Sequence, residues 1–144
     1  MSSELEALIN EVRLLFNQCS RLAEDLHSEL PVTVAMRAVL EFVTGNGPTT
    51  VPGIARSRRV SRQHIQVLVN DLIDHGLVRM EANPGHKRSL LVTLTAKGRR
   101  TFEAMRQRER RLLRAAMAVL PKNKLKLATQ TLRDVSAALE SIEA

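Results

Sequence analysis

Four side chains that can form hydrogen bonds with nucleic-acid bases stand together in the sequence: Arg62, Gln63, His64 and Gln66. A glutamine amide can pair with two adjacent groups of adenine, and an arginine guanidinium can pair with two acceptors of guanine. Each such pairing contributes ~1–3 kcal/mol of discrimination against the wrong base. We therefore expect this group to recognise bases in a DNA major groove. The sequence does not decide which of the four contacts a base and which a phosphate, and for His64 a neutral place on the surface is an equal alternative.

An amphipathic helix that begins after Ser61 has to position these side chains. A serine hydroxyl can satisfy a free backbone N–H of the first helical turn, so Ser61 is the expected N-cap. Apolar residues then recur at helical spacing and predict a buried side, and Gly76 is expected to end the helix. The predicted buried residues are Ile65, Leu68, Val69, Leu72 and Ile73. Arg62, Gln63, Gln66 and Asn70 fall on the other side.

Further basic residues flank this helix. Arg56, Arg58 and Arg59 precede it and are expected to contact phosphates, with a solvated surface charge as the alternative for each of them. After it, residues 78–82 and 90–94 have the composition of two short strands, and Asn83-Pro84-Gly85 is expected to be the turn. The predicted DNA-binding set comprises Arg56, Arg58, Arg59, Ser61, Arg62, Gln63, His64, Gln66, Lys87 and Arg88.

Charge is distributed unevenly along the 144 residues, whose formal net charge is +7. Residues 1–50 hold three Arg and seven acids, whereas residues 51–100 hold ten Lys or Arg and three acids. The basic residues are therefore concentrated around the predicted helix and hairpin, which favours a polyanionic partner. A basic face that only keeps the protein in solution is the alternative. For the basic run 97–114, a DNA-facing start and a solvated helix face both stay open.

The composition excludes several other classes of protein. Hydrophobic residues make up 44% of the chain and aromatic residues 2%, so an aliphatic core is expected without stacking platforms for single-stranded nucleic acid. No run of apolar residues in the sequence is long enough to span a bilayer, and no signal peptide is recognisable. We therefore expect a cytoplasmic protein that contacts no membrane. No Gly-rich phosphate loop, catalytic triad or metal-ligand pair is recognisable, so we expect neither an enzyme nor a metal site.

Apolar stripes predict further helices on both sides of this region. We expect helices at about 4–28, 32–44, 51–58 and 95–120, and a last helix after Pro121, with residues 45–50 as a loop. The stripe of the first helix and the narrow seam of the last one are expected to pack helix against helix in a dimer. The predicted dimerisation residues are Leu5, Leu8, Val12, Leu125, Leu132, Val135, Leu139 and Ile142.

With these motifs in order, the chain resembles the MarR (multiple antibiotic resistance regulator) family of winged helix-turn-helix transcription factors. The segment IARSRRVSRQHIQVLVNDLIDHGLV is similar to the family's helix-turn-helix core, and NPGHKRSLLVTLTAKG is similar to its wing. The chain departs from the family's pattern at the wing, where Asn83 and His86 replace two acidic positions. Arg88 consequently lacks its usual carboxylate brace, so the wing is expected to be more mobile or to be braced by another group.

The resemblance implies a mainly α fold with a small β-wing. It also implies three parts: an N-terminal dimerisation helix (1–30), a winged helix-turn-helix domain (31–98) and C-terminal dimerisation helices (99–144). The implied function is that of a homodimeric repressor that binds a pseudo-palindromic double-stranded operator. A small anionic or phenolic effector would release it, and no cofactor is expected. The alternatives are a chromosome-architectural protein without sequence preference or effector, and an interaction module that has lost DNA binding.

Cys19 lies within the apolar stripe of the first helix. Some proteins of the resembled family sense peroxides through a first-helix cysteine that is helped by tyrosines, and this chain has no Tyr. A low thiol pKa requires a positive or polar setting. We therefore expect a buried structural cysteine, with a redox-active thiol as the alternative.

Overall fold

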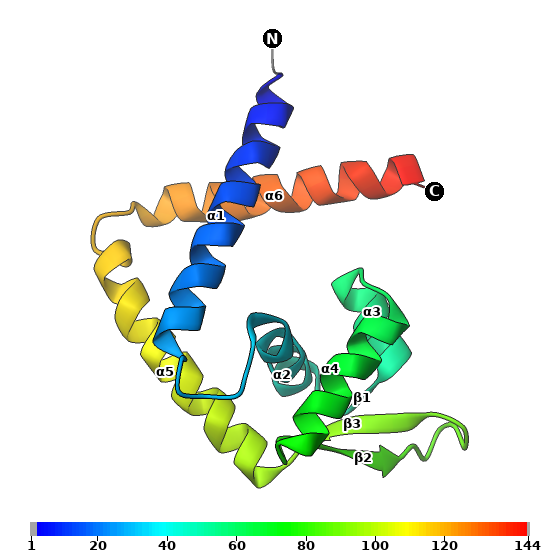
Figure 1. The fold of residues 1–144 in the computed structure, drawn as a ribbon. Coiled ribbons are helices and arrows are strands. Elements are labelled where there is room, and N and C mark those ends of the chain that lie inside the picture. The colour runs from blue at the N-terminus through cyan, green and yellow to red at the C-terminus, as the bar shows by residue number, and fades with distance from the viewer. Residues whose placement is uncertain (1–2, 144) are drawn as a thin grey trace. The chain divides into compact units, whose positions relative to one another are not determined.

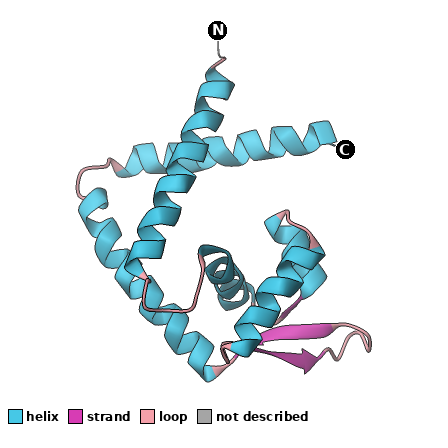
Figure 2. Ribbon diagram, in the orientation of Figure 1, coloured by secondary structure: helices cyan, strands magenta, loops and turns pink. Residues whose placement is uncertain are grey.

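A computed structural model describes residues 3–143 of the chain. It contains six helices and three short strands (Figures 1 and 2). They are, in chain order, α1 (Glu4–Leu26), α2 (Val34–Asn46), β1 (Thr49–Thr50), α3 (Val51–Arg58), α4 (Arg62–Asp74), β2 (Val78–Ala82), β3 (Leu90–Leu94), α5 (Ala96–Met117) and α6 (Lys122–Glu143). The chain divides into two compact units, residues 1–107 and 108–144, with the boundary inside α5. The predicted mainly α fold with a small β-wing is confirmed.

Side-chain caps start the helices where the sequence predicts them. The Ser61 hydroxyl accepts a hydrogen bond from the His64 N–H (3.0 Å) and begins α4. Thr50 caps α3 in the same way. In α1 the cap is reciprocal, because Ser3 Oγ accepts from the Glu6 N–H while Glu6 Oε2 accepts from the Ser3 N–H. Each cap satisfies a backbone donor that the helix leaves without an internal partner.

The three strands form an antiparallel sheet in the order β1-β3-β2. Val78 is paired with Leu94 at one end of the β2–β3 hairpin, and Ala82 is paired with Leu90 at the other. Strand β1 adds Thr49 opposite Val92. The expectation of a loop over residues 45–50 was wrong at both ends, because α2 continues to Asn46, and Thr49 and Thr50 pair with β3. This pairing depends on residues some forty positions away and leaves no local pattern.

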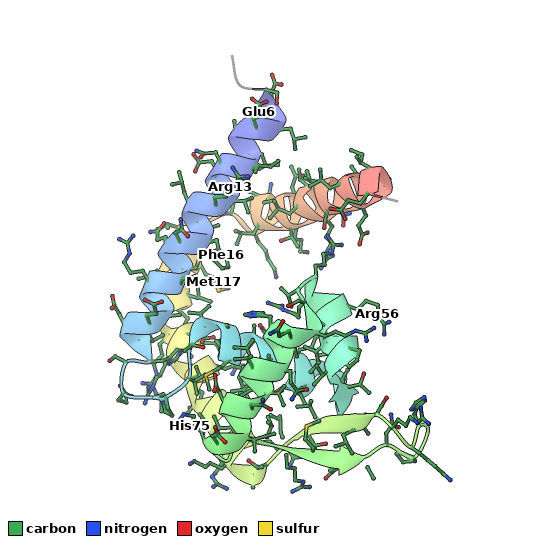
Figure 3. All side chains as sticks on the ribbon, turned by 45° about the vertical axis from the view of Figure 1, so that its right-hand side comes forward. Glu6, Arg13, Phe16, Arg56, His75 and Met117 are labelled. Carbon is green, nitrogen blue, oxygen red and sulfur yellow. The ribbon has the colours of Figure 1, made fainter. Side chains whose placement is uncertain are left out.

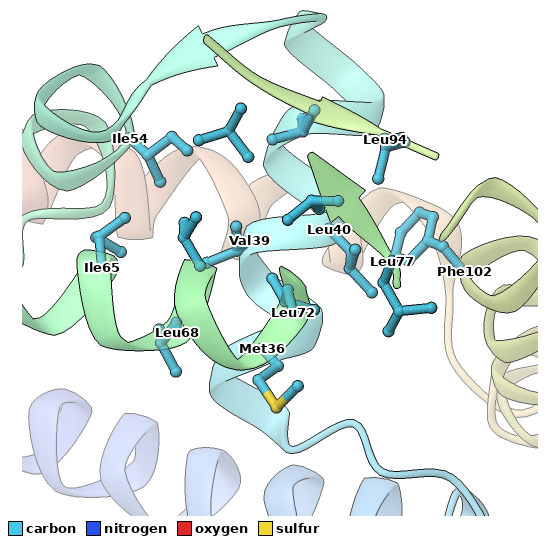
Figure 4. Packing of buried hydrophobic residues seen from close by; sticks show 14 of the residues in the cluster. Met36, Val39, Leu40, Ile54, Ile65, Leu68, Leu72, Leu77, Leu94 and Phe102 are labelled. Atoms are coloured by element: carbon cyan, nitrogen blue, oxygen red, sulfur yellow. The ribbon is translucent and has the colours of Figure 1, made fainter. Parts of the chain in front are cut away.

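One aliphatic core holds together α2, α3, α4, the sheet and the first half of α5, which together are called the winged lobe below. Leu40, Ile54 and Leu72 are enclosed completely within this core (Figure 4). The core residues are Val32, Met36, Val39, Leu40, Val43, Val51, Ile54, Ala55, Ile65, Leu68, Val69, Leu72, Leu77, Val78, Val92, Leu94, Phe102 and Met105. Phe102 is the aromatic member, and the guanidinium groups of Arg37 and Arg106 lie 5.3 and 5.7 Å from the centre of its ring.

Several helix ends differ from the expected ones by two or three residues. Helix α1 ends at Leu26 rather than 28, α2 begins at Val34 rather than 32, and α5 ends at Met117 rather than 120. None of these shifts moves a candidate functional residue. Within residues 3–143, no helix combines the length and the apolar character needed to cross a membrane.

Candidate DNA-binding surface

Helix α4 presents its polar side to solvent because its apolar side is fixed in the core. Ile65, Val69 and Leu72 are at most 2% exposed, and Leu68 is 8% exposed. This anchoring determines the rotation of the helix about its axis, so the opposite face must point outward. The prediction of Ile73 as a buried residue was wrong, since its side chain is 38% exposed and lies beside the anchored face.

The outward face of α4 carries the predicted base-reading side chains. Arg62, Gln63, His64 and Gln66 are all exposed, and so is Asn70. The Gln66 amide Nε2 donates a hydrogen bond to Asn70 Oδ1 over 2.9 Å, so these two side chains support each other across one helical turn. Gln63, Gln66 and Asn70 thus share the outward face, while Arg62 and His64 are exposed on its two flanks.

Val67 also lies on this face and was absent from the predicted set. Its side chain is 53% exposed, and its place in the helix puts it between Gln63 and Asn70. The apolar periodicity of α4 does not include position 67, because that position falls opposite the anchored residues. An apolar residue on the predicted polar side of the helix was therefore the feature of the sequence that could have identified Val67 as a candidate.

The end of α3 carries two exposed arginines, Arg56 and Arg58, and the exposed Arg59 follows directly in the turn that leads to α4. Figure 3 shows Arg56 on the outer side of α3. Arg59 adopts a left-handed backbone conformation (φ 58°) and ends α3, because its N–H donates to the carbonyls of Ala55 and Arg56. Within residues 3–143, it is the one non-glycine residue with positive φ. This conformation costs an ordinary residue ~1–2 kcal/mol, so the turn retains an arginine where glycine would be favoured.

Glu81 on β2 of the wing forms an ion pair with Arg79 of the same strand and a hydrogen bond with Thr93 of β3. Arg79 Nε donates a hydrogen bond to Glu81 Oε1 over 2.9 Å, and the Thr93 hydroxyl donates to Glu81 Oε2 from the neighbouring strand over 3.3 Å. The hydrogen bond from Arg79 is the main cause that lowers the pKa of the Glu81 carboxyl below its ordinary value, and the charge of Arg79 and the Thr93 hydroxyl add to it. Arg79 and Thr93 therefore favour the ionised form of the Glu81 carboxyl.

The tip of the wing leaves its two cations exposed. Asn83 Oδ1 accepts a hydrogen bond from the Gly85 N–H, and Ser89 Oγ lies 3.4 Å from His86 Nδ1. Lys87 and Arg88 are exposed, and Arg88 forms no ion pair or hydrogen bond with any residue in the described part of the chain. The turn is therefore braced by Asn83, His86 and Ser89, and the guanidinium of Arg88 is available to a partner.

A latch of three residues joins the end of α4 to the start of α5. The Thr95 hydroxyl donates to the carbonyl of Gly76 (2.6 Å) and accepts from the Gly98 N–H (2.9 Å). Lys97 Nζ donates to the carbonyl of His75 (3.1 Å) at the C-terminal end of α4. A Cβ atom at Gly98 would overlap the carbonyl oxygen of Leu77, so only glycine allows this close approach. Thr95, Lys97 and Gly98 therefore hold the start of α5 against the residues that directly follow α4.

Cys19 lies on α1 and is exposed in the single chain, which overturns the expectation of a buried cysteine. Helix α1 as a whole has no buried residue, so its apolar stripe is not covered by the chain itself. Among residues 3–143, no three His, Cys, Asp or Glu side chains come together in an arrangement that could hold a metal ion.

An anchored helix with an outward polar face, preceded by a short helix and followed by a basic hairpin, defines a winged helix-turn-helix protein. A sequence profile of the MarR family matches residues 31–89, which cover most of the winged lobe. An uncharacterized protein of Mycobacterium tuberculosis is 35% identical over 108 residues, which is 75% of each chain. The chain belongs to the MarR family of transcriptional regulators.

Solved structures show the same fold. MarR of Staphylococcus aureus, determined with salicylate and kanamycin, superposes with a TM-score of 0.82 at 18% identity, covering 94% of this chain and 92% of that one. BpsR of Bordetella bronchiseptica, whose DNA binding is regulated by 6-hydroxynicotinic acid, gives a TM-score of 0.78 at 18% identity, covering 94% and 97%. At this level of identity the similarity concerns the fold alone.

Proposed function

We propose that this protein is a homodimeric, sequence-specific repressor that acts on double-stranded DNA in the cytoplasm and is released by a small-molecule effector. The observation that carries the proposal is the exposed face of α4. Its apolar side is enclosed in the core, while Gln63 and Gln66 lie on the outward face and Arg62 is exposed on its flank. Long hydrogen-bonding side chains on an anchored, protruding helix serve recognition of base edges.

The candidate residues divide into three groups by their place on this surface. Arg62, Gln63, His64 and Gln66 lie on α4 and would contact bases in the major groove. Ser61 and the arginines at the end of α3 (Arg56, Arg58 and the C-cap Arg59) would bind phosphates, which position a protein without reading sequence. At the wing tip, Lys87 and Arg88 would reach the minor groove or its phosphates. The Arg88 guanidinium is suited to this contact because it has no partner within the described residues.

Dimerisation is supported by the apolar surface that α1 and α6 leave uncovered. Leu5, Leu8 and Val12 of α1 are exposed or half-buried, and no residue within Lys122–Glu143 is buried in the single chain. We define the α6 seam as Leu125, Leu132, Val135, Leu139 and Ile142. A second copy of the chain would cover the seam, the stripe of α1 and Cys19 with it. Two-fold symmetry would then place two α4 helices about 34–36 Å apart, facing a pseudo-palindromic operator.

A small aromatic acid is the proposed effector. Two proteins of similar fold were studied with salicylate and with 6-hydroxynicotinic acid, and both molecules are aromatic acids. An effector releases DNA only if it binds more tightly to an arrangement of the lobes that does not fit the operator. Salicylate is therefore the first probe, and a lowered affinity of the full chain for its operator is the expected result.

Selection of bound duplexes from a random pool tests the DNA-binding proposal. A regulator should enrich one palindromic sequence, whereas an architectural protein should bind selected and random duplexes equally. Gln63→Ala should weaken binding to the selected duplex about 5- to 100-fold and leave binding to random DNA almost unchanged. Gln130→Ala on α6 is the matched control and should alter neither affinity. Equal affinity of the unaltered protein for both duplexes would exclude a sequence-specific regulator.

A further inference from the structure

Val67 lies in the middle of the row of side chains that faces away from the core on α4, which we call the outward ridge and which includes Gln63, Val67 and Asn70. At ~100° of rotation per residue, position 67 lies almost opposite the direction defined by Ile65 and Leu72. Gln63 precedes it by one turn, and Asn70 follows it by nearly one turn. The side chain is 53% exposed, although the rest of this ridge is polar. Any DNA duplex that meets Gln63 and Asn70 must also meet Val67.

The fold provides no reason for a valine at this position. Its side chain does not belong to the core or to the partly buried residues that pack against the core. A β-branched residue also lowers helix propensity relative to alanine, because its χ1 freedom is lost against the preceding turn. Isolated exposed aliphatic side chains are common on protein surfaces. The distinguishing feature of Val67 is its place in the centre of the polar ridge.

The chemistry around Val67 is complementary to an A·T base pair. In the major groove, the methyl group of thymine is the apolar feature, while adenine offers one acceptor and one donor. The hydrogen bond between Gln66 and Asn70 uses Nε2 of Gln66 and Oδ1 of Asn70. The remaining carbonyl of Gln66 can accept a hydrogen bond, and the remaining amide of Asn70 can donate one. An acceptor, a donor and an apolar group therefore lie within one helical turn.

We propose that Val67 is a specificity-determining residue that contacts the 5-methyl group of a thymine in each half-site. This inference rests on the proposed function and deepens it, because it names the base that one position of α4 recognises. Contact with the methyl group would exclude water from two small apolar surfaces. It would favour thymine over cytosine, which has no methyl group at that place.

Replacement of thymine by deoxyuridine tests this contact directly. Deoxyuridine removes the methyl group and leaves the hydrogen-bonding groups of the base unchanged. Each thymine of the selected duplex would be replaced in turn, and the affinity of the unaltered protein would be measured by fluorescence anisotropy of the labelled DNA. We expect one symmetric position at which the loss is about fourfold for each half-site substituted. At this same position, the affinity of Val67→Ala should not depend on the methyl group.

Two further variants serve as controls for the methyl contact. Ile73→Ala removes a 38% exposed aliphatic side chain from the flank of the same helix and should leave the deoxyuridine effect intact. Val67→Thr keeps one of the two methyl groups at nearly equal size and should keep part of the effect. Because Val67 is exposed, neither Val67→Ala nor Val67→Thr should lower the thermal midpoint of the protein.

The outcomes separate this inference from the proposed function. If Val67→Ala retains the full deoxyuridine effect at every position, Val67 does not contact a thymine methyl group, and the sequence preference of the protein stands. If the unaltered protein does not distinguish selected from random duplexes, the proposed function fails and the inference fails with it.

Discussion

In the winged lobe, Leu40 and Leu72 are completely enclosed, whereas Leu132 and Leu139 on α6 are 42% and 43% exposed. The same residue type therefore has two different roles in one chain. In the lobe, leucines from helices and strands cover each other, so the core is complete within a single copy. On α1 and α6, regular apolar rows have no covering partner in the single chain. Apolar surface of this extent indicates an interaction site rather than a free face.

The remaining exposed apolar side chains strengthen this contrast. Most of the large exposed ones lie outside the winged lobe, on α1, the end of α5, the connection that follows it, and α6. They are Leu5, Val12, Leu14, Leu15, Phe16, Leu22, Leu112, Leu113, Met117, Val119, Leu120, Leu125, Leu127, Leu132, Leu139 and Ile142. Stability of the lobe should consequently be a property of one chain, whereas stability of these helices should depend on protein concentration.

Leu132→Asp should have the largest effect, because it places a charge in the proposed interface of each copy. An uncompensated buried charge costs ~3–5 kcal/mol, and a symmetric dimer would contain two of them. We expect a monomer in sedimentation velocity. Leu127→Asp is the matched control, since Leu127 lies almost opposite Leu125 around the axis of α6 and therefore falls outside the seam. A dimer of unchanged affinity for Leu132→Asp would contradict the assignment of the α6 seam.

Gly98→Ala should have the next largest effect and should act on the lobe alone. The added Cβ would overlap the backbone carbonyl of Leu77, which no side-chain movement can relieve. We expect a loss of about 3 kcal/mol in the free energy of unfolding, measured by urea denaturation. Gly45→Ala is the control, because nothing lies within 4 Å of its added Cβ near the end of α2. It should stabilise the lobe by about 0.5–1 kcal/mol. Equal effects of the two variants would contradict the close approach at Gly98.

Arg59→Gly should separate folding from DNA binding within the lobe. Relief of the left-handed conformation should raise the free energy of unfolding by about 1 kcal/mol, while loss of the charge should weaken DNA binding. Arg58→Gly, the control, lies inside α3 and should lower the free energy of unfolding by about 1 kcal/mol while also weakening binding. Urea denaturation and binding at several salt concentrations measure both quantities. An Arg59→Gly variant with stronger DNA binding would show that Arg59 does not contact phosphate.

Glu81→Gln should have the smallest effect, which should depend on pH. The pKa of Glu81 is lowered, chiefly by the hydrogen bond from Arg79. The carboxylate therefore stabilises the folded state above its unfolded pKa, and this contribution is lost as the pH falls through its folded pKa. The thermal midpoint of Glu81→Gln should lie slightly below that of the unaltered protein at pH 7 and should meet it in acid. A constant difference at all pH values would show that the ion pair does not stabilise the wing.

Local rules predicted the elements of the lobe well. The caps at Thr50 and Ser61, and the hairpin between residues 78 and 94, each depend on a few neighbouring residues that are visible in the sequence. Strand β1 was missed because two threonines become a strand only when β3 lies beside them. Cys19 was wrongly expected to be buried, since the stripe that contains it would be covered only by a second copy.

On the candidate DNA-binding surface, the apolar periodicity of α4 predicted the side of the helix correctly for some residues and wrongly for others. It separated Ile65 and Leu72 from the polar residues, but it assigned Ile73 to the wrong side because that residue lies about 90° from the centre of the anchored face. The candidate residues were selected because they are polar, so the apolar Val67 was overlooked. The direction in which an aliphatic residue points on a two-sided helix becomes evident only when the core is known.

The latch formed by Thr95, Lys97 and Gly98 has a consequence for regulation. Because it ties the residues directly after α4 to the first turn of α5, a tilt of α4 should be accompanied by a tilt of the start of α5. In the dimer proposed above, a movement of the lobes would therefore change the distance between the two α4 helices more readily than the face that each α4 presents. Operators of closely related proteins that retain this latch should accordingly differ more in spacer length than in the sequence of their arms.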